Sequence, residues 1–158
     1  MGDIYHNAMI YMSKDNIPLA NESFAYLVKD SSTKISELAD LSRANIAVND
    51  NKISEAQKLF ENILLNKKYS DITTAYATIN WMSIELNKKK INKDKIEKYS
   101  RIFNNNHIFY GTGSILRSLQ LLRNNQHHEA KLILQAVAAS KNVPDTIKHN
   151  AHAILGNL

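Results

Sequence analysis

Residues 43–63 constrain the fold most, because their spacing fits two packed helices joined by a tight polar turn. Ala44, Ala47 and Ala56 are small and fall where two helices would approach each other closely. Phe60 follows Ala56 by one helical turn, so these two side chains face the same seam. The stretch therefore predicts a helical hairpin of a kind that stacks on further hairpins.

The composition predicts an all-α protein with one domain over residues 1–158. A chain of 158 residues can bury roughly two thirds of its unfolded surface. It has only four Gly and two Pro, so it has few of the residues that tight β-turns need, whereas Leu, Ala, Lys, Glu and Ile recur at helical spacing. The absence of cysteine excludes thiol catalysis and thiolate metal sites.

The apolar pattern predicts nine helices, with a polar break at 29–32 after the second. Their expected ranges are about 4–12, 18–28, 34–48, 53–65, 71–86, 94–103, 110–123, 126–140 and 144–155. Pro18 and Pro144 suit the start of a helix, and Ser70 or Asp71 can cap the fifth. The third carries apolar residues on two faces, with Leu38 and Val48 on one of them, which predicts a sandwiched helix.

A period of about 36 or 37 residues relates the hairpins. Ala20 and Ala56 are 36 residues apart, and Ala56 and Ala130 are 74 apart. Small residues also stand twelve apart in three hairpins: Ala8 and Ala20, Ala44 and Ala56, Ser118 and Ala130. Such a period predicts stacked helix pairs. The third copy, 71–103, departs from the pattern and has extra residues in its connection.

These units resemble the tetratricopeptide repeat, whose two helices carry small residues at their closest approach and an aromatic residue one turn later. The matching positions are Ala8, Tyr11, Ala20, Phe24 and Leu27, then Ala44, Ala47, Ala56, Phe60 and Ile63, then Ser118, Leu121, Ala130, Leu134 and Val137. The resemblance implies a right-handed α-solenoid of about four helical hairpins. The last helix, with a polar face of Lys148, His149 and His152, would be its C-terminal cap.

At whole-chain scale the order of features is similar to tetratricopeptide-like proteins of the bacterial inner membrane, related to the ancillary subunit of the Sec translocon, in their α-proteobacterial form. The best anchors are 35–39 followed by 54–56, and 116–122 followed by 128–134. The resemblance implies a non-enzymatic scaffold for a protein partner, as in a translocon accessory or chaperone. Members usually carry an N-terminal transmembrane helix. We expect the periplasmic face of the inner membrane if such an anchor was trimmed, and the cytoplasm otherwise.

In such a superhelix the first helix of each pair lines the concave surface, where a polypeptide segment or partner subunit would lie. The groove positions carried over from the family are Tyr5, Met9, Met12, Leu41, Asn45, Val48, Ile115, Leu119 and Leu122. Helical phase in the third copy adds Tyr76 and Asn80. The alternative for the aliphatic positions is ordinary core packing, so Asn45, Tyr76 and Asn80 are the better candidates.

One basic cluster offers an alternative function. It lies between Lys88 and Arg101 and includes Lys88, Lys89, Lys90 and Lys93, in a chain of net charge +5. It favours an anionic membrane surface over nucleic acid, because only Tyr99 is available to stack on a base. A solvated loop is the plainer interpretation.

No grouping of residues predicts an enzyme. His149 and His152 are three apart on one helix but have only Asp145 as a nearby carboxylate, so we interpret them as a polar outer face. The stretch 111–113 lacks the Gly-Lys that a phosphate cradle needs, and we interpret it as a helix start. We expect no catalytic residue, no cofactor and no bound metal.

Overall fold

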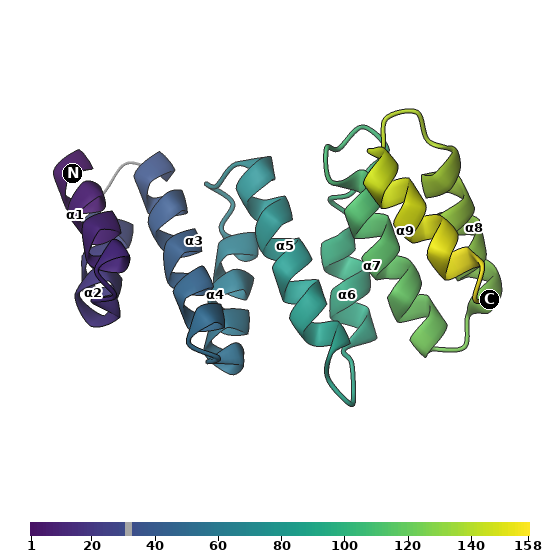
Figure 1. The fold of residues 1–158 in the computed structure, drawn as a ribbon, viewed down its shortest axis with the longest axis horizontal. Helices are drawn as coiled ribbons and strands as arrows, with labels where there is room; N and C mark the ends of the chain where they lie inside the picture. Colours follow the sequence, from purple (N-terminus) through teal and green to yellow (C-terminus); the bar gives the residue numbers. More distant parts are fainter. Residues whose placement is uncertain (31–32) are drawn as a thin grey trace. The chain divides into compact units, whose positions relative to one another are not determined.

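The computed structural model describes residues 1–30 and 33–158, and within these ranges it has nine helices and no strand (Figure 1). The predicted all-α class is confirmed for this part of the chain. The helices are α1 (Gly2–Ser13), α2 (Ile17–Asp30), α3 (Thr33–Asn49), α4 (Ile53–Leu65), α5 (Asp71–Leu86), α6 (Lys93–Ser100), α7 (Tyr110–Arg123), α8 (His127–Ala139) and α9 (Asp145–Leu155). The break predicted at 31 and 32 lies outside the described residues.

The chain forms two compact units, Met1–Trp81 and Met82–Leu158. In the first unit α1 packs on α2, α2 on α3 and α3 on α4, and α1 also contacts α3. In the second unit α6 packs on α7, α7 on α8 and α8 on α9, and α9 also reaches α7. Helix packing in both units is therefore largely between sequence neighbours, as in a helical repeat.

Three hairpins close through the same three-residue turn. Its central residue is Asp15, Asn51 or Asn125, with φ of 57°, 57° and 59°, and Asn and Asp adopt this left-handed conformation more readily than other non-glycine residues. The following amide donates to the carbonyl five residues back: Asn16 to Tyr11 at 2.8 Å, Lys52 to Ala47 at 2.8 Å, and Gln126 to Leu121 at 2.9 Å. The α1–α2, α3–α4 and α7–α8 pairs thus share one backbone device.

The small residues of the repeat are all buried. Ala8, Ala20, Ala44, Ala56, Ser118 and Ala130 are each 0 % exposed. Phe24, Phe60 and Leu134, four residues after the second alanine of each pair, are also fully buried. Small side chains let each helix pair approach closely, and the large residue one turn later fills the core beside them.

The α5–α6 connection is built differently, over the six residues 87–92. Glu85, only 3 % exposed, accepts hydrogen bonds from the Asn92 amide at 2.7 Å and from Lys88 Nζ at 2.6 Å. The Arg123 guanidinium donates to the carbonyl oxygens of Leu86 and Lys89. Side chains therefore shape the connection that the sequence marks as irregular.

The sixth helix ends earlier than the predicted range 94–103. The Asn92 side chain accepts from the Lys95 amide at 3.0 Å and so caps the start of α6. Phe103 consequently lies beyond the end of α6 and is nevertheless buried.

Within the described ranges, no helix combines the length and the apolar content that crossing a membrane requires.

Candidate functional site

A carboxylate of α3 holds the start of α5. Glu37 accepts hydrogen bonds from the Ser70 amide at 3.0 Å, the Ser70 hydroxyl at 2.8 Å and the Thr73 hydroxyl at 2.6 Å. Ser70 Oγ also accepts from the Thr73 amide at 3.3 Å, so that of the two predicted caps, Ser70 and Asp71, it is Ser70 that caps α5. Partial burial raises the pKa of the Glu37 carboxyl, but the hydrogen bonds from Thr73 and Ser70 outweigh it, so that the pKa lies below its ordinary value.

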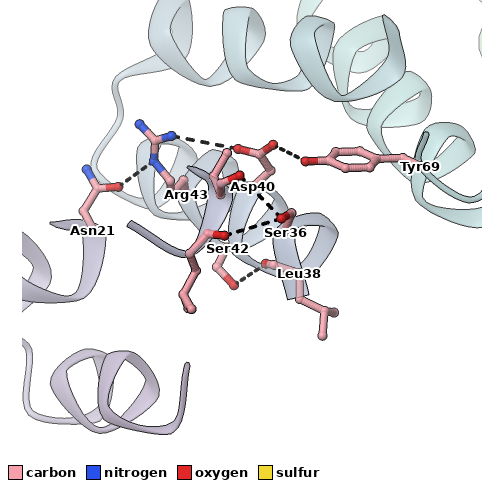
Figure 2. Close-up of polar contacts among 9 residues, drawn as sticks. Asn21, Ser36, Leu38, Asp40, Ser42, Arg43 and Tyr69 are labelled. Atoms are coloured by element: carbon pink, nitrogen blue, oxygen red, sulfur yellow. Dashed lines mark hydrogen bonds and ion pairs between the residues drawn. The ribbon is translucent and has the colours of Figure 1, made fainter. Parts of the chain in front are cut away.

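A second carboxylate of α3 joins three segments of the first unit. Figure 2 shows Asp40 between Arg43 and Tyr69. Asp40 accepts a hydrogen bond from the Tyr69 hydroxyl at 2.7 Å and lies 3.9 Å from Arg43, whose Nε donates to Asn21 of α2 at 3.3 Å. Burial and the Asp40 carboxylate raise the pKa of Tyr69, which keeps its hydroxyl a donor.

These contacts fix α5 against α3 so that two of the predicted partner-binding residues meet. The Tyr76 hydroxyl lies 3.5 Å from Asn45 Oδ1, a long hydrogen bond. Tyr76 is exposed and Asn45 is half-buried. Asn45 has no other side-chain hydrogen bond within the described ranges, so its amide N–H groups are available to a partner.

Exposed apolar side chains flank this pair. Leu38, two turns before Asn45 on α3, is 49 % exposed, and Ile72, one turn before Tyr76 on α5, is 59 % exposed. Val48 is exposed as well. The predicted sandwich is confirmed in that α3 packs on both α2 and α4, with Ala39, Ala44 and Ile46 buried. Leu38 and Val48 themselves stay open to solvent.

The remaining predicted positions lie in different surroundings. The Tyr5 ring meets Phe24 edge to face at 5.7 Å and packs on the core of α1–α3. Met9 is exposed on α1. Asn80 Nδ2 donates to the carbonyl of Tyr76 at 2.9 Å, so part of its amide is used within α5. The structure thus brings Asn45 and Tyr76 together, with Asn80 one turn further along.

Residues 1–158 match the family described as "Protein of unknown function (DUF2659)". The chain belongs to this family. It is also 35% identical over 150 residues to an uncharacterized protein of Rickettsia prowazekii (strain Madrid E), and the alignment covers 92% of this chain and 68% of that protein. No solved structure matches the chain. Neither description names an activity, so a function for this family member has to be argued from its residues.

The predicted basic cluster of this family member divides into two kinds of lysine. Lys88 forms an ion pair with the buried Glu85 carboxylate. Lys89, Lys90 and Lys93 are exposed and form no ion pair within the part of the chain that the structure describes. Three charges, rather than four, are therefore available to an anionic surface.

Two histidines considered as metal ligands lie on the exposed face of α9. His149 Nδ1 lies 2.7 Å from the Asp145 carbonyl oxygen, an interaction internal to the helix, and His152 is exposed. Across residues 1–30 and 33–158, no group of three or more His, Cys, Asp or Glu side chains has the arrangement that a metal ion needs.

The sequence reasoning missed Glu37, Asp40 and Tyr69, which position the Asn45–Tyr76 pair. Their partners are about 30 residues away, and a glutamate or aspartate on a helix is ordinarily read as part of a solvated face. Only the prediction that Ser70 or Asp71 caps the fifth helix pointed to this place.

Proposed function

We propose that this chain is a non-enzymatic protein–protein interaction domain, and that it binds a polypeptide segment on the α3–α5 face around Asn45 and Tyr76. We further propose that its helices form a tetratricopeptide-like right-handed α-solenoid of about four hairpins, with α9 as the C-terminal cap. The observation that carries the proposal is the 3.5 Å approach of Tyr76 to Asn45 on an open, apolar face.

The chemistry of this face suits a polypeptide. The Asn45 amide offers both a donor and an acceptor, which is the complement of a peptide group. Leu38 and Ile72 offer apolar area to the partner's side chains, and Tyr76 combines an apolar ring with a polar tip, as interface tyrosines do. An exposed group of apolar side chains rimmed by polar atoms is typical of an interaction surface.

The resemblance to ancillary Sec translocon proteins supports a specific setting. We propose that the domain works at the periplasmic face of the bacterial inner membrane, as a membrane-anchored translocon accessory or chaperone-like protein. The three shared hairpin turns and their buried small residues support the repeat on which that resemblance depends.

The test is partner capture from detergent-solubilised inner membranes by the wild-type domain and by the double variant Asn45→Ala, Tyr76→Ala. We expect the double variant to keep its thermal unfolding midpoint to within a few degrees and to lose most of the captured partner. Tyr26→Ala, which removes another exposed tyrosine, from α2, is the matched control and should capture as wild type does.

Unchanged capture by a folded double variant would contradict the proposal. A third variant tests the alternative function, contact with an anionic surface. In this variant Lys89, Lys90 and Lys93 are replaced together by Gln. If that variant loses binding in a salt-dependent manner while the Asn45–Tyr76 variant keeps it, the basic cluster is the binding surface instead.

A further inference from the structure

The second unit contains a pocket of about 350 Å³ between α6, α7 and α8. Its polar lining includes Ser100, Tyr110, Ser114 and Arg117, and Leu132 and Ile133 belong to its apolar wall. Its two charged residues, Arg117 and Arg101, are both cationic. A pocket of this size and lining suits a small ligand group that carries negative charge.

Arg117 lacks the acidic partner that the corresponding arginine of the first unit has. Arg43 stands eight residues before the left-handed Asn51, and Arg117 stands eight before the left-handed Asn125. Arg43 lies 3.9 Å from Asp40, three residues earlier in α3. The residue three before Arg117 is Ser114, which has no charge.

The half-buried Arg117 guanidinium is held by a single hydrogen bond, from Nη1 to Ser100 Oγ at 3.2 Å. Within the described ranges no carboxylate lies within ion-pair distance of it. A guanidinium carries five N–H donors in a planar fork that fits a carboxylate through two parallel hydrogen bonds. Most of that donor capacity therefore faces the pocket unused.

The pocket also lacks the large side chain that the regular hairpins place at this point. The second helices of the pairs can be aligned by counting from the residue before each helix. The eighth residue after it is Phe24 in α2, Phe60 in α4 and Leu134 in α8, but Ser100 in α6. The three large residues are fully buried, and Ser100 lines the pocket. The pocket therefore lacks both the large apolar side chain and the carboxylate that the first unit has at the corresponding positions.

Phe103 and Gly113 form one wall of the pocket. Phe103 packs so closely on α7 that a Cβ added at Gly113 would lie 2.2 Å from its ring. Only glycine at position 113 allows that approach, and both Phe103 and Gly113 line the pocket. One wall of the pocket is therefore the close contact between Phe103 and α7.

We propose that this pocket binds a carboxylate carried on an aromatic or branched apolar group. The carboxylate would pair with Arg117 as Asp40 pairs with Arg43, and the apolar group would fill the volume that Phe24 fills in the regular hairpin. Such a group is found in a free small carboxylic acid and in the C-terminal residue of a polypeptide. This inference goes beyond the partner-binding face and does not depend on Tyr76.

The test follows chemical shifts of the intact 158-residue chain during titration with N-acetyl-L-phenylalanine and with its uncharged amide. We expect saturable shifts at Ser100, Ser114 and Arg117 with the acid and at least a tenfold weaker response with the amide. Charge-assisted hydrogen bonds contribute about 1.5–3 kcal/mol, which corresponds to this change or more. Arg117→Gln should weaken binding of the acid by a similar factor.

Two further variants make the result decisive. Lys131→Gln removes one positive charge from the exposed face of α8 and should bind as wild type does. Ala136→Trp keeps Arg117 but fills the pocket and should abolish binding. Equal binding of acid and amide, equal losses for Arg117→Gln and Lys131→Gln, or unchanged binding by Ala136→Trp would each overturn the proposal.

A short peptide that ends in phenylalanine distinguishes the two sources of the ligand. Tighter binding of this peptide than of N-acetyl-L-phenylalanine supports a polypeptide C-terminus, and equal or weaker binding supports a free small acid. The variant Asn45→Ala, Tyr76→Ala should leave both titrations unchanged, so failure of the partner-binding face and failure of this pocket give different results.

Discussion

The α3–α4 and α5–α6 pairs follow each other in the chain but are closed in different ways. Three residues join α3 to α4 through the left-handed Asn51, and the turn is made by backbone hydrogen bonds. Six residues join α5 to α6, and the buried Glu85 carboxylate organises them. The regular pair therefore relies on backbone conformation where the irregular pair relies on side chains.

The order of small and large side chains is also reversed between the two pairs. Ala56 and then Phe60 face the seam of α3–α4, whereas α6 has Ile96 and then Ser100 at the corresponding positions, all four of them buried. The candidate functional features gather at the irregular pair, with Tyr76 and Asn80 on α5 and the Arg117 pocket beside Ser100. Each candidate site therefore joins one residue of a regular hairpin, Asn45 on α3 or Arg117 on α7, to the irregular pair.

Removing the Glu85 carboxylate, which closes the irregular α5–α6 pair, tests this comparison with the largest expected effect. Glu85→Ala should destabilise the protein by about 1–3 kcal/mol, because the Asn92 amide and the Lys88 ammonium lose their buried acceptor. This loss of stability is measured as the decrease in the free energy of unfolding in urea. Glu97→Ala, which removes an exposed glutamate from α6, should have an effect below about 0.5 kcal/mol. Equal losses would show that Glu85 does not organise the connection.

A smaller effect is expected at the turn of the regular pair. Asn51→Ala should cost about 1–2 kcal/mol, because alanine is strained in the left-handed conformation, whereas Asn51→Gly should be neutral or slightly stabilising. Urea unfolding of the two variants provides the comparison. If both variants lose the same stability, the Asn51 side chain matters and the backbone conformation does not.

The smallest effect concerns the start of α5 and depends on pH. Because the pKa of Glu37 lies below its ordinary value of 4.5, its stabilising hydrogen bonds are fully present above that value. They are lost as the pH falls through the lowered pKa. Glu37→Gln should therefore unfold at a lower temperature than wild type at pH 7, and the difference should shrink as the pH is lowered below 4.5. A difference in unfolding temperature between wild type and Glu37→Gln that stays constant with pH would contradict a charged Glu37 carboxylate as the acceptor.

Periodicity was sufficient to predict the helices, because helix formation depends on which face of a segment is apolar. The 36- and 74-residue spacings among Ala20, Ala56 and Ala130 located the three regular hairpins, and the third copy was recognisable by its departure. The sixth helix was predicted to reach Phe103 but ends at Ser100, because apolar spacing indicates that Phe103 is buried and not that it is helical.

The sites were less predictable, because they depend on contacts between residues distant in sequence. Asn45 followed from the resemblance to the tetratricopeptide repeat and Tyr76 from helical phase, but the contacts of Glu37 and Asp40 that bring them together did not. Arg117 becomes notable only when it is compared with Arg43, and that comparison requires knowing that Asp40 is the partner of Arg43 and that Ser114 stands in its place.

The most direct test of the central claim is photo-crosslinking in cells that produce the protein, with a photoreactive phenylalanine derivative at position 76 of α5 or at position 26 of α2. A polypeptide-binding α3–α5 face predicts a discrete crosslinked protein partner from position 76 that is absent from position 26. Crosslinks of equal yield and identity from both positions, or none from position 76, would contradict it.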